Sequence, residues 1–512
     1  MGKVVIIGLD GGNFDIIQKW KDKLPTLKKF IDHGSSGYLK TTIPPLTIPA
    51  WPSFYTGKNP GKYGVFDFVD RTSKNKNKIV DSTYVKSDSL WSILSKDNKK
   101  CCVINVPLTY PAKKINGLMI TGLLTPKRDS FFTYPKQLSE KIKDYRLHLD
   151  VGYTKKKKKE FFNDAVKVHR ARAKTSIDLV KSQYFDFFMV VFTMTDEISH
   201  HYWKDMVKKT KYEKAIFRIY READNSIKKL MDTAGKDTNF IIMSDHGFGS
   251  LEKMVNLNLF LIDKKLLFLK KEILTNLKYN LFKLGFTPTN IYNLVCKLGL
   301  QDFFPEPRIN KNVREKLLNI FLSFSDVDWN RTIAYSLGNV GQIHLNKKDI
   351  HYKKKVIKSL YNLKENNESI IDEIYEKKDL YSGKYFEYAT DLCLKMKDFS
   401  YISYPVFVNS NKIIDNHPLG ISGGHRLHGV FLAYGPDIKF NNVKNAEIID
   451  ITPTVLHMFN QEIPPDMDGK VLKEIFKENS DFLKNKIKYE KIDKTNLEKQ
   501  KINKTLKKLR LL

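Results

Sequence analysis

The sequence predicts an α/β protein with a doubly wound, mainly parallel β-sheet and helices on both faces of that sheet. Short apolar runs rich in β-branched residues recur along the chain, and amphipathic helical stretches separate several of them. Such runs are typical of buried parallel strands, and their alternation with helices is typical of doubly wound sheets. Acidic and imidazole side chains stand beside several of these runs, where this class of fold exposes functional groups at strand ends.

Five apolar runs are expected to form strands of this sheet. The first is short, β-branched and followed by a glycine turn, and the others share its character. The runs are Val4 to Leu9, Cys102 to Val106, Phe187 to Thr193, Phe240 to Ser244 and Val430 to Tyr434. A helix that belongs to the core is expected later in the chain, from Ile448 to Phe459.

Two segments depart from this alternation. Residues 251 to 327 show helical periodicity with Gly and Pro breaks, which predicts an inserted helical cap. Residues 332 to 409 predict a smaller α+β unit, with strands near Ile333 to Leu337 and Gln342 to Leu345 and a charged helix from about Tyr352. We therefore expect one catalytic domain, residues 1 to 475, that contains both.

A basic tail, residues 476 to 512, follows this domain. From Asp481 to Leu512 there are eleven Lys or Arg residues against four Asp or Glu residues. The apolar positions Leu497, Ile502, Leu506 and Leu509 have the spacing of one helical face. Such a helix could lie on an anionic membrane and bring the protein to lipid-linked or glycan-linked molecules. The alternatives are a frayed terminus or a helix packed on the catalytic domain.

Composition limits the location and the partners that we expect. The chain has 512 residues and a net charge of +31, which favours phosphorylated metabolites, nucleic acid or an anionic lipid surface as partners. A lysine-rich composition throughout the chain is a competing explanation. No apolar stretch reaches the roughly 18 residues of a spanning helix, and Asp10 interrupts the first apolar run well short of a signal-peptide core. Four cysteines are too few for a disulfide framework, so we expect a cytoplasmic protein with reduced cysteines.

Asp10 is the first candidate functional residue. It follows the first expected strand in the sequence GLDGG, whose glycines permit a sharp turn and a close approach to a ligand. The glycine spacing does not match a dinucleotide-binding pattern, and a carboxylate in this turn would repel phosphate unless a cation lay between them. Metal ligation accounts for the acidic residue, and a turn former or a helix cap is the alternative.

Thr47 stands between prolines in the sequence TIPPLTIPAW. The prolines restrain the backbone on both sides and would hold one hydroxyl in a fixed pose, as a nucleophile requires. A helix N-cap is the alternative for a hydroxyl ahead of a helix. Because a threonine hydroxyl is a weak nucleophile at its ordinary pKa, a metal ion would have to assist it.

Further candidate metal ligands follow other expected strands. Asp196 and His200 are four residues apart, a spacing that puts both on one face of a helix, although an ordinary helix pair is the alternative. Asp245 and His246 end another strand, and His425 lies in the glycine-flanked sequence GGHR, where a structural histidine is the alternative. Together the set supplies three aspartates, three histidines and one hydroxyl. That set suits Zn²⁺ best and Mn²⁺ next.

At these residues the chain resembles the alkaline phosphatase superfamily, most closely its branch of type I phosphodiesterase and nucleotide pyrophosphatase-like proteins. The motifs that carry the resemblance extend over most of the chain. They are IIGLDG (6–11), PPLTIPAW (44–51), TGKNPGK (56–62), DHGFG (245–249), YSLG (335–338), GHR (424–426), IDITPT (449–454) and DMDG (466–469).

The resemblance implies a role for each candidate residue. It groups Asp10, Thr47, Asp245 and His246 around one metal ion, and Asp196, His200 and His425 around the other. Thr47 matches the nucleophile of the family, and a threonine there argues against sulfatase chemistry. Relatives often have a histidine where this chain has Tyr63, so no role is assigned to that position. Asn59 and the backbone amides near Thr47 are candidate stabilisers of the phosphoryl oxygens.

These observations predict a metal-dependent phosphohydrolase that cleaves a phosphodiester or pyrophosphate through a phosphothreonine on Thr47. A phosphotransferase that uses the same site is an alternative, because a helical cap could exclude water and shape an acceptor pocket. A protein that mainly binds nucleic acid or membrane through its positive charge is a further alternative.

Overall fold

The computed structural model describes residues 3–70, 78–128, 131–154, 156–297, 320–404, 407, 410–416 and 420–491. A nine-stranded sheet forms its centre, in the order β20-β2-β19-β7-β1-β6-β3-β4-β5. The strands are β1 (Lys3–Leu9), β2 (Ser35–Lys40), β3 (Cys101–Val106), β4 (Gly117–Thr121), β5 (Thr133–Tyr134), β6 (Phe187–Phe192), β7 (Thr238–Met243), β19 (His428–Tyr434) and β20 (Asn441–Glu447).

The sheet is mainly parallel, as the sequence predicts. β19 pairs antiparallel with β7 and β2, and β5 pairs antiparallel with β4, whereas the other neighbouring strands pair in parallel. The five expected runs correspond to β1, β3, β6, β7 and β19. The apolar pattern does not reveal β2 or β20, because their sequences, SSGYLK and NNVKNAE, are largely polar.

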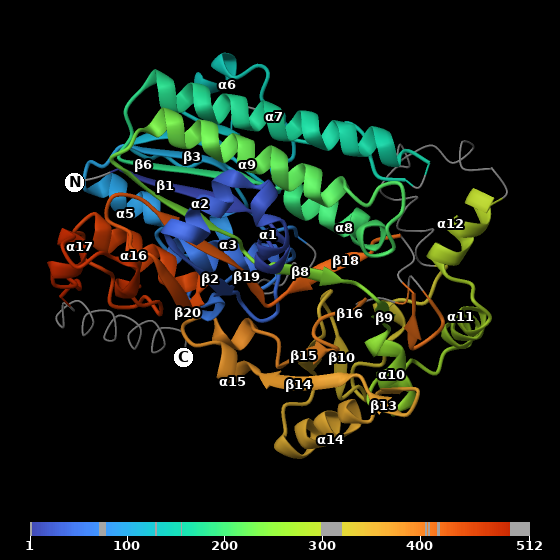
Figure 1. Ribbon diagram of the computed structural model, residues 1–512. Coiled ribbons are helices and arrows are strands. Elements are labelled where there is room, and N and C mark those ends of the chain that lie inside the picture. Colours follow the sequence, from blue (N-terminus) through green and yellow to red (C-terminus); the bar gives the residue numbers. More distant parts are fainter. Residues whose placement is uncertain are drawn as a thin grey trace.

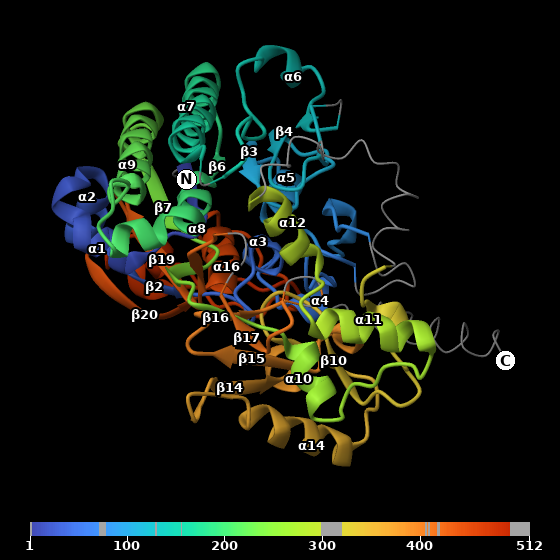
Figure 2. The same ribbon diagram turned by 90° about the vertical axis from the view of Figure 1, so that its right-hand side faces the viewer.

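Helices cover both faces of the sheet (Figure 1). One face carries α1 (Phe14–Trp20), α2 (Pro25–His33), α7 (Lys158–Ser182), α8 (Met194–Val207) and α9 (Ala215–Ala234). The helices α7 and α9 lie side by side there (Figure 2). The opposite face carries α3 (Thr47–Thr56), α5 (Leu90–Lys96) and α16 (Ile451–Met458), and the last of these is the expected core helix.

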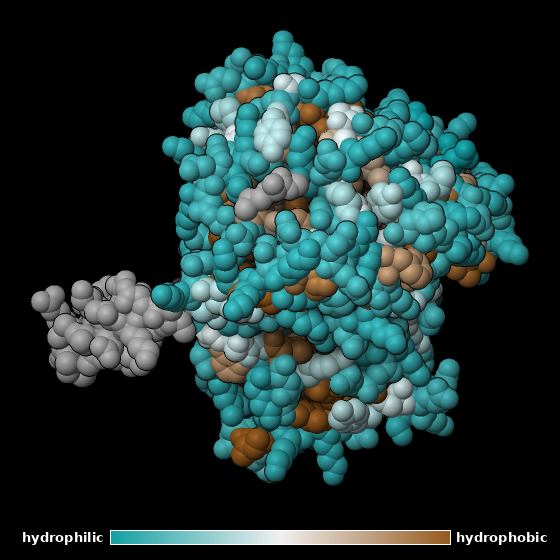
Figure 3. All heavy atoms as spheres, turned by 60° about the vertical axis from the view of Figure 1, so that its left-hand side comes forward, coloured by the Kyte–Doolittle hydropathy of each residue, from teal (hydrophilic) through white to brown (hydrophobic). Residues whose placement is uncertain are grey.

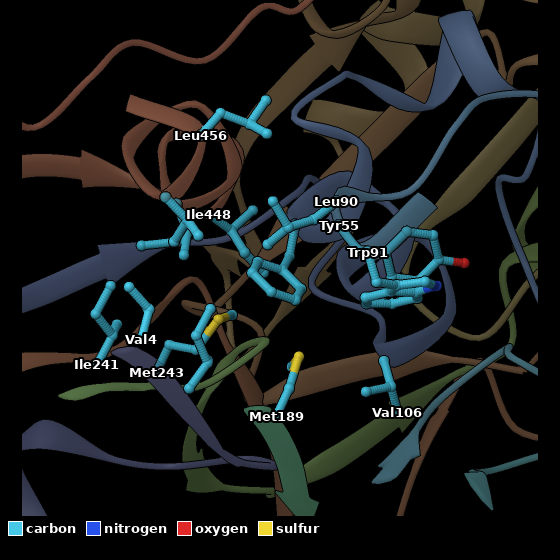
Figure 4. Close-up of a cluster of buried hydrophobic side chains, with 14 of the residues drawn as sticks. Val4, Tyr55, Leu90, Trp91, Val106, Met189, Ile241, Met243, Ile448 and Leu456 are labelled. Atoms are coloured by element: carbon cyan, nitrogen blue, oxygen red, sulfur yellow. The ribbon is translucent and has the colours of Figure 1, made fainter. Parts of the chain in front are cut away.

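Alternation along β1 divides the core into two layers. Successive strand residues point to opposite faces, so Val4 and Ile6 join the cluster beneath α3, α5 and α16. Val5 and Ile7 join the cluster beneath the long helices. Figure 4 shows the first cluster, with Val4, Met189, Ile241 and Met243 from the sheet facing residues of the covering helices. Burial on both faces explains why β1 is a continuous apolar run.

A smaller sheet lies beside the main one, in the order β10-β11-β15-β14, with neighbouring strands antiparallel. Its elements include β10 (Ala334–Ser336), β11 (Gln342–Leu345), α14 (Ile350–Tyr361), β14 (Ile371–Glu376) and β15 (Leu392–Met396). The two expected strands and the expected charged helix correspond to β10, β11 and α14.

The segment expected to be a helical cap contains β9 (Lys253–Val255), α10 (Leu257–Asp263), α11 (Ile273–Lys283) and α12 (Pro288–Lys297), and residues 298–319 lie outside the described part. The helices α11 and α12 lie at the outer edge of the molecule (Figure 1). Apolar residues between positions 255 and 267 share one cluster with the smaller sheet. The division of the chain into domains remains a prediction.

The start of the basic tail packs on the main domain. Phe482, in the short helix α17 (Asp481–Lys484), is buried, and Tyr489 forms a parallel bridge with Ile463. The positions Leu497, Ile502, Leu506 and Leu509 all lie outside the described residues. No helix in the described ranges is long and apolar enough to cross a bilayer.

Hydrophilic side chains cover most of the face shown in Figure 3, with apolar residues in small groups. Inside the protein, Cys101, Cys102 and Cys393 are buried free thiols, as expected. The side chain of Cys296 is outside the described part.

Candidate metal centre and nucleophile

Three candidate aspartates meet because they follow three neighbouring parallel strands. The strand order places β7, β1 and β6 side by side, and their carboxyl ends share one edge of the sheet. Asp10 follows β1, Asp196 lies in the first turn of α8 just after β6, and Asp245 comes two residues after β7. Asp10 and Asp245 are buried, and Asp196 is partly buried. Sequence reasoning places the three residues correctly at strand ends.

Helix α8 presents Asp196 and His200 together, as their spacing predicts. One turn separates them, and the His200 Nε2 atom lies 3.5 Å from Asp196 Oδ2. His425 reaches the same place from β18 (Gly423–Arg426), which pairs antiparallel with β8 (Gly247–Ser250). The His425 Nε2 atom lies 3.4 Å from Asp196 Oδ1 and 3.1 Å from His200 Nε2.

His246 lies at the middle of the cluster and is fully buried. Its Nε2 atom is 3.2 Å from Asp245 Oδ2, and it is 3.9 Å from one carboxylate oxygen of each of Asp10 and Asp196. The His246 ring also stacks on the ring of His425, with 3.5 Å between centroids. Asp245 and His246 are adjacent in the sequence, and both side chains can point into the cluster because the chain turns between β7 and β8.

Thr47 is the first residue of α3, and its hydroxyl joins the cluster. The Oγ1 atom lies 3.2 Å from His246 Nε2. The N-cap position belongs to Leu46, whose side chain makes no capping hydrogen bond, so the helix-cap alternative for Thr47 is wrong. Pro44 and Pro45 lead into this helix, which leaves the hydroxyl directed at the acid and imidazole groups.

Each of the three imidazoles is oriented by a backbone carbonyl. The Nδ1 atoms lie 2.9 Å from Gly423 O for His200, 3.1 Å from Gly247 O for His246 and 2.9 Å from Pro45 O for His425. An Nδ1–H group that donates to a carbonyl leaves Nε2 as the free lone pair, which is the usual arrangement of metal-ligating histidines. Sequence reasoning could not identify these carbonyls, because no residue type distinguishes them.

The carboxylates carry unsatisfied charge. Asp10 Oδ1, Asp196 Oδ1 and Asp245 Oδ2 are buried and have no hydrogen-bond partner. Burial, followed by the charges of Asp245 and Asp196, raises the pKa of Asp10 well above its ordinary value. Burial, followed by the charge of Asp196, raises the pKa of Asp245 to about 7. An unpaired buried charge is costly, and divalent cations would remove that cost.

The donor atoms fall into two overlapping groups. Oxygen and nitrogen atoms of Asp10, Asp245 and His246 lie within 4.8 Å of one another, and so do those of Asp196, His246 and His425. The first group agrees with the expected ligands of one ion. In the second group His246 stands where His200 is expected, although His200 Nε2 contacts both Asp196 and His425. Orphaned carboxylate oxygens and free imidazole lone pairs therefore fit bound divalent metal ions.

Gly11 supplies the space that this cluster needs. Its backbone has φ of +62°, and a Cβ atom there would lie 2.9 Å from Asp196 Oδ1. Its N–H group donates to Asp245 Oδ1 at 3.1 Å. The glycine after Asp10 therefore permits both the turn and the close approach of the other carboxylates.

Asn59 is not brought to the cluster. Its side chain caps α4 (Pro60–Tyr63) by accepting from Gly61 N, and its Nδ2 atom donates to Asp468 Oδ2 at 2.9 Å and to Ser382 Oγ at 3.1 Å. These bonds give Asn59 a structural role and leave no donor for a phosphoryl oxygen.

Tyr63 is also structural. It is fully buried, and its hydroxyl donates to Pro49 O at 2.6 Å and lies 2.9 Å from Ser53 Oγ. It therefore braces α3 from the side.

A comparison with models of protein families identifies the family of this chain. Residues 4–405 match the family model of type I phosphodiesterase / nucleotide pyrophosphatase, and the chain belongs to this family. Membership places the protein among hydrolases that act on phosphate esters, as the sequence predicts.

A solved structure of human ectonucleotide pyrophosphatase / phosphodiesterase 5 is similar in fold, with a TM-score of 0.52. Its sequence is 14% identical, and the match covers 93% of this chain and 100% of that one. A search of curated protein sequences found no match.

Proposed function

We propose that the protein hydrolyses a phosphodiester or pyrophosphate through a covalent phosphothreonine on Thr47, with two divalent metal ions in the Asp/His cluster. The observation that carries the proposal is the position of Thr47 Oγ1, 3.2 Å from His246 Nε2, beside the buried carboxylates of Asp10 and Asp245 and the partly buried one of Asp196. The donor set suits Zn²⁺ best and Mn²⁺ next, because it combines imidazole and carboxylate ligands.

The chain's own residues account for the two steps. Thr47 Oγ1 loses its proton to solvent and attacks phosphorus. As the new P–O bond forms, the bond to the departing ester oxygen breaks, and its electron pair leaves with that oxygen. Water then attacks the phosphothreonine and restores the hydroxyl. Asp10, Asp245 and His246 would hold one ion, and Asp196, His200 and His425 the other. When bound, the ions neutralise the carboxylates, lower the pKa of the Thr47 hydroxyl and stabilise charge on the phosphoryl oxygens.

The proposal is tested with Thr47→Ala and Thr47→Ser, using bis(4-nitrophenyl) phosphate as substrate. We expect turnover to be abolished in Thr47→Ala and partly retained in Thr47→Ser, which keeps a hydroxyl. The metal content of both variants should stay close to that of the wild type, because the Asp and His ligands remain. Mass spectrometry of acid-quenched wild-type protein should show a phosphoryl adduct on the peptide that contains Thr47.

Thr42→Ala is a matched control. Thr42 lies in the same proline-rich loop, and its hydroxyl donates to Pro44 O at 3.2 Å, outside the cluster. Thr42→Ala removes a hydroxyl from the same loop and keeps the proposed nucleophile, so activity should persist. Full activity in Thr47→Ala would exclude Thr47 as the nucleophile, and an inactive wild type with a full metal complement would refute the hydrolase proposal.

A further inference from the structure

A cavity of about 250 Å³ opens beside the metal cluster. His200 and His425 form part of its lining, so the cavity is continuous with the reaction centre. Its apolar walls come from the loop that precedes α3, from the segment that follows α4, from the turn between β10 and β11 and from residues 399–402. The apolar residues of these walls include Pro45, Leu46, Phe68, Val340, Phe399 and Ile402.

No acidic or basic side chain other than the two imidazoles is present in the described lining of the cavity. Among the described residues that line it there is no Lys, Arg, Asp or Glu, although the chain contains 88 Lys and Arg residues. Arg426 follows His425 directly, but its guanidinium is turned away and donates to the carbonyls of Phe399 at 3.0 Å and His425 at 2.9 Å. The described part of the lining therefore contributes no positive charge from Lys or Arg.

The walls are joined to the nucleophile. Leu46 immediately precedes Thr47, and it packs against Val340 and Phe399. The carbonyl of Pro45 accepts from His425 Nδ1 at 2.9 Å. One rigid segment thus forms both a cavity wall and the start of α3, so a group held in the cavity would have its phosphate next to the Thr47 hydroxyl.

The lining is poorly suited to a nucleoside. A base and a ribose carry several donors and acceptors, and burying them without partners is unfavourable. Besides the two imidazoles, Asn339 and Tyr404 are the polar side chains in the described lining. A hydrocarbon or aryl group would have no such unpaired atoms, and it would gain from leaving water.

We propose that this cavity binds an uncharged, apolar group esterified to the phosphate, so that the substrate is a phosphate ester of an apolar alcohol. This inference rests on the hydrolase function proposed above. The cavity volume corresponds to about eight methylene groups, if each takes roughly the 30 Å³ share of a water molecule.

The test uses alkyl 4-nitrophenyl phosphates with chains from one to twelve carbons. All of them release the same 4-nitrophenolate, so differences in kcat/KM report the retained alkyl group. We expect kcat/KM to rise about fourfold per methylene group and to level off near eight carbons. Phenyl and naphthyl esters form a second arm that distinguishes an aryl occupant from a flexible chain, and the 4-nitrophenyl ester of thymidine 5′-phosphate forms a third.

Two variants each place a polar group in the lining of the cavity. Phe68 and Ile402 are partly exposed, so Phe68→Asn and Ile402→Asn should fold. In both variants the slope of log kcat/KM against chain length should fall to less than half of the wild-type slope. Phe440→Asn is the matched control, because Phe440 is 69% exposed and does not line the cavity, and it should keep the wild-type slope.

The outcomes separate this inference from the function on which it rests. Hydrolysis with no dependence on chain length, or a clear preference for the thymidine ester, would overturn the apolar cavity while leaving the hydrolase intact. An unchanged slope in both wall variants would also overturn it. Absence of turnover for every ester, in protein loaded with metal, would instead refute the proposed function.

Discussion

Replacing Asp245 with Asn should stabilise the metal-free protein and empty one of the two proposed metal sites. Asp245 Oδ1 accepts from Gly11 N, and the oxygen of an amide could keep that bond. Asp245 Oδ2 has no hydrogen-bond partner, and neither does Asp10 Oδ1. An amide N–H group in place of Oδ2 would offer Asp10 a donor and would remove one negative charge from a buried cluster.

The magnitude follows from the distance between the carboxylates. Ligand oxygens of Asp10 and Asp245 lie within 4.8 Å of each other, so two unit charges would repel by about 3 kcal/mol at an effective dielectric constant of about 20. Burial and the charge of Asp196 act in the same direction, because they raise the pKa of Asp245 to about 7. For a chain of 512 residues, about 3 kcal/mol shifts the melting temperature by roughly 3 °C.

The sign of the pH dependence is determined by that pKa. Burial, then the charge of Asp196, raises the folded-state pKa of Asp245 above its unfolded value. The metal-free wild type therefore loses stability as the pH rises from about 4 to about 7, because the folded cluster must release the proton. Asp245→Asn lacks this contribution, so its advantage should be largest above pH 7.

The assay is differential scanning fluorimetry at pH 8.5, with chelator and with added Zn²⁺. In chelator, Asp245→Asn should melt a few degrees above the wild type. With Zn²⁺ the order should reverse, because a ligand that binds only the folded state stabilises it and the variant lacks that site. Asp232→Asn is the control, since Asp232 is exposed in an ion pair with Lys228 and should change stability by less than about 0.5 kcal/mol. A metal-free variant less stable than the wild type would refute the repulsion argument.

Two further predictions follow from other contacts. His425→Ala should remove one ion of two, because Asp196 and His200 alone are too few ligands to hold a metal ion. Metal analysis of the purified protein would detect this loss. The control is His428→Ala, three residues further on, which should keep both ions. Lys278→Met should reduce the free energy of unfolding by about 3–5 kcal/mol in chemical denaturation. The reason is that Asp326 is buried and its carboxylate, 3.0 Å from Lys278 Nζ, would lose its ion-pair partner. A loss below about 1 kcal/mol, as expected for an exposed pair, would contradict this prediction.

Local pattern was sufficient to predict much of the main sheet. β1, β3, β6, β7 and β19 are buried on both faces, so each is a continuous apolar run that can be recognised without knowing its neighbours. The same reasoning failed for β2 and β20, whose residues are mostly polar. Nothing local marks such segments as strands, because they become strands only by pairing along the sheet beyond β19.

The chemistry of the site was also readable in part from the sequence. Residue types and strand-end positions identified Asp10, Thr47, Asp196, His200, Asp245, His246 and His425, which the structure brings into one cluster. Local context misled at Asn59, because its motif lies close to Thr47 in sequence while its side chain turns toward Asp468 and Ser382. Proximity along the chain does not determine the direction in which a side chain points.

By itself the sequence determined which segments are buried strands and which donor atoms are available, because both follow from local apolar pattern and residue type. Tertiary structure alone decided how those atoms meet. Thr47 and His246, whose side chains face each other, are 199 residues apart in the sequence. His200 and His425, whose Nε2 atoms face each other, are 225 residues apart. Packing between such distant segments determines the strand order, the carbonyls that orient each imidazole and the apolar cavity beside them. No local pattern in the sequence encodes that packing.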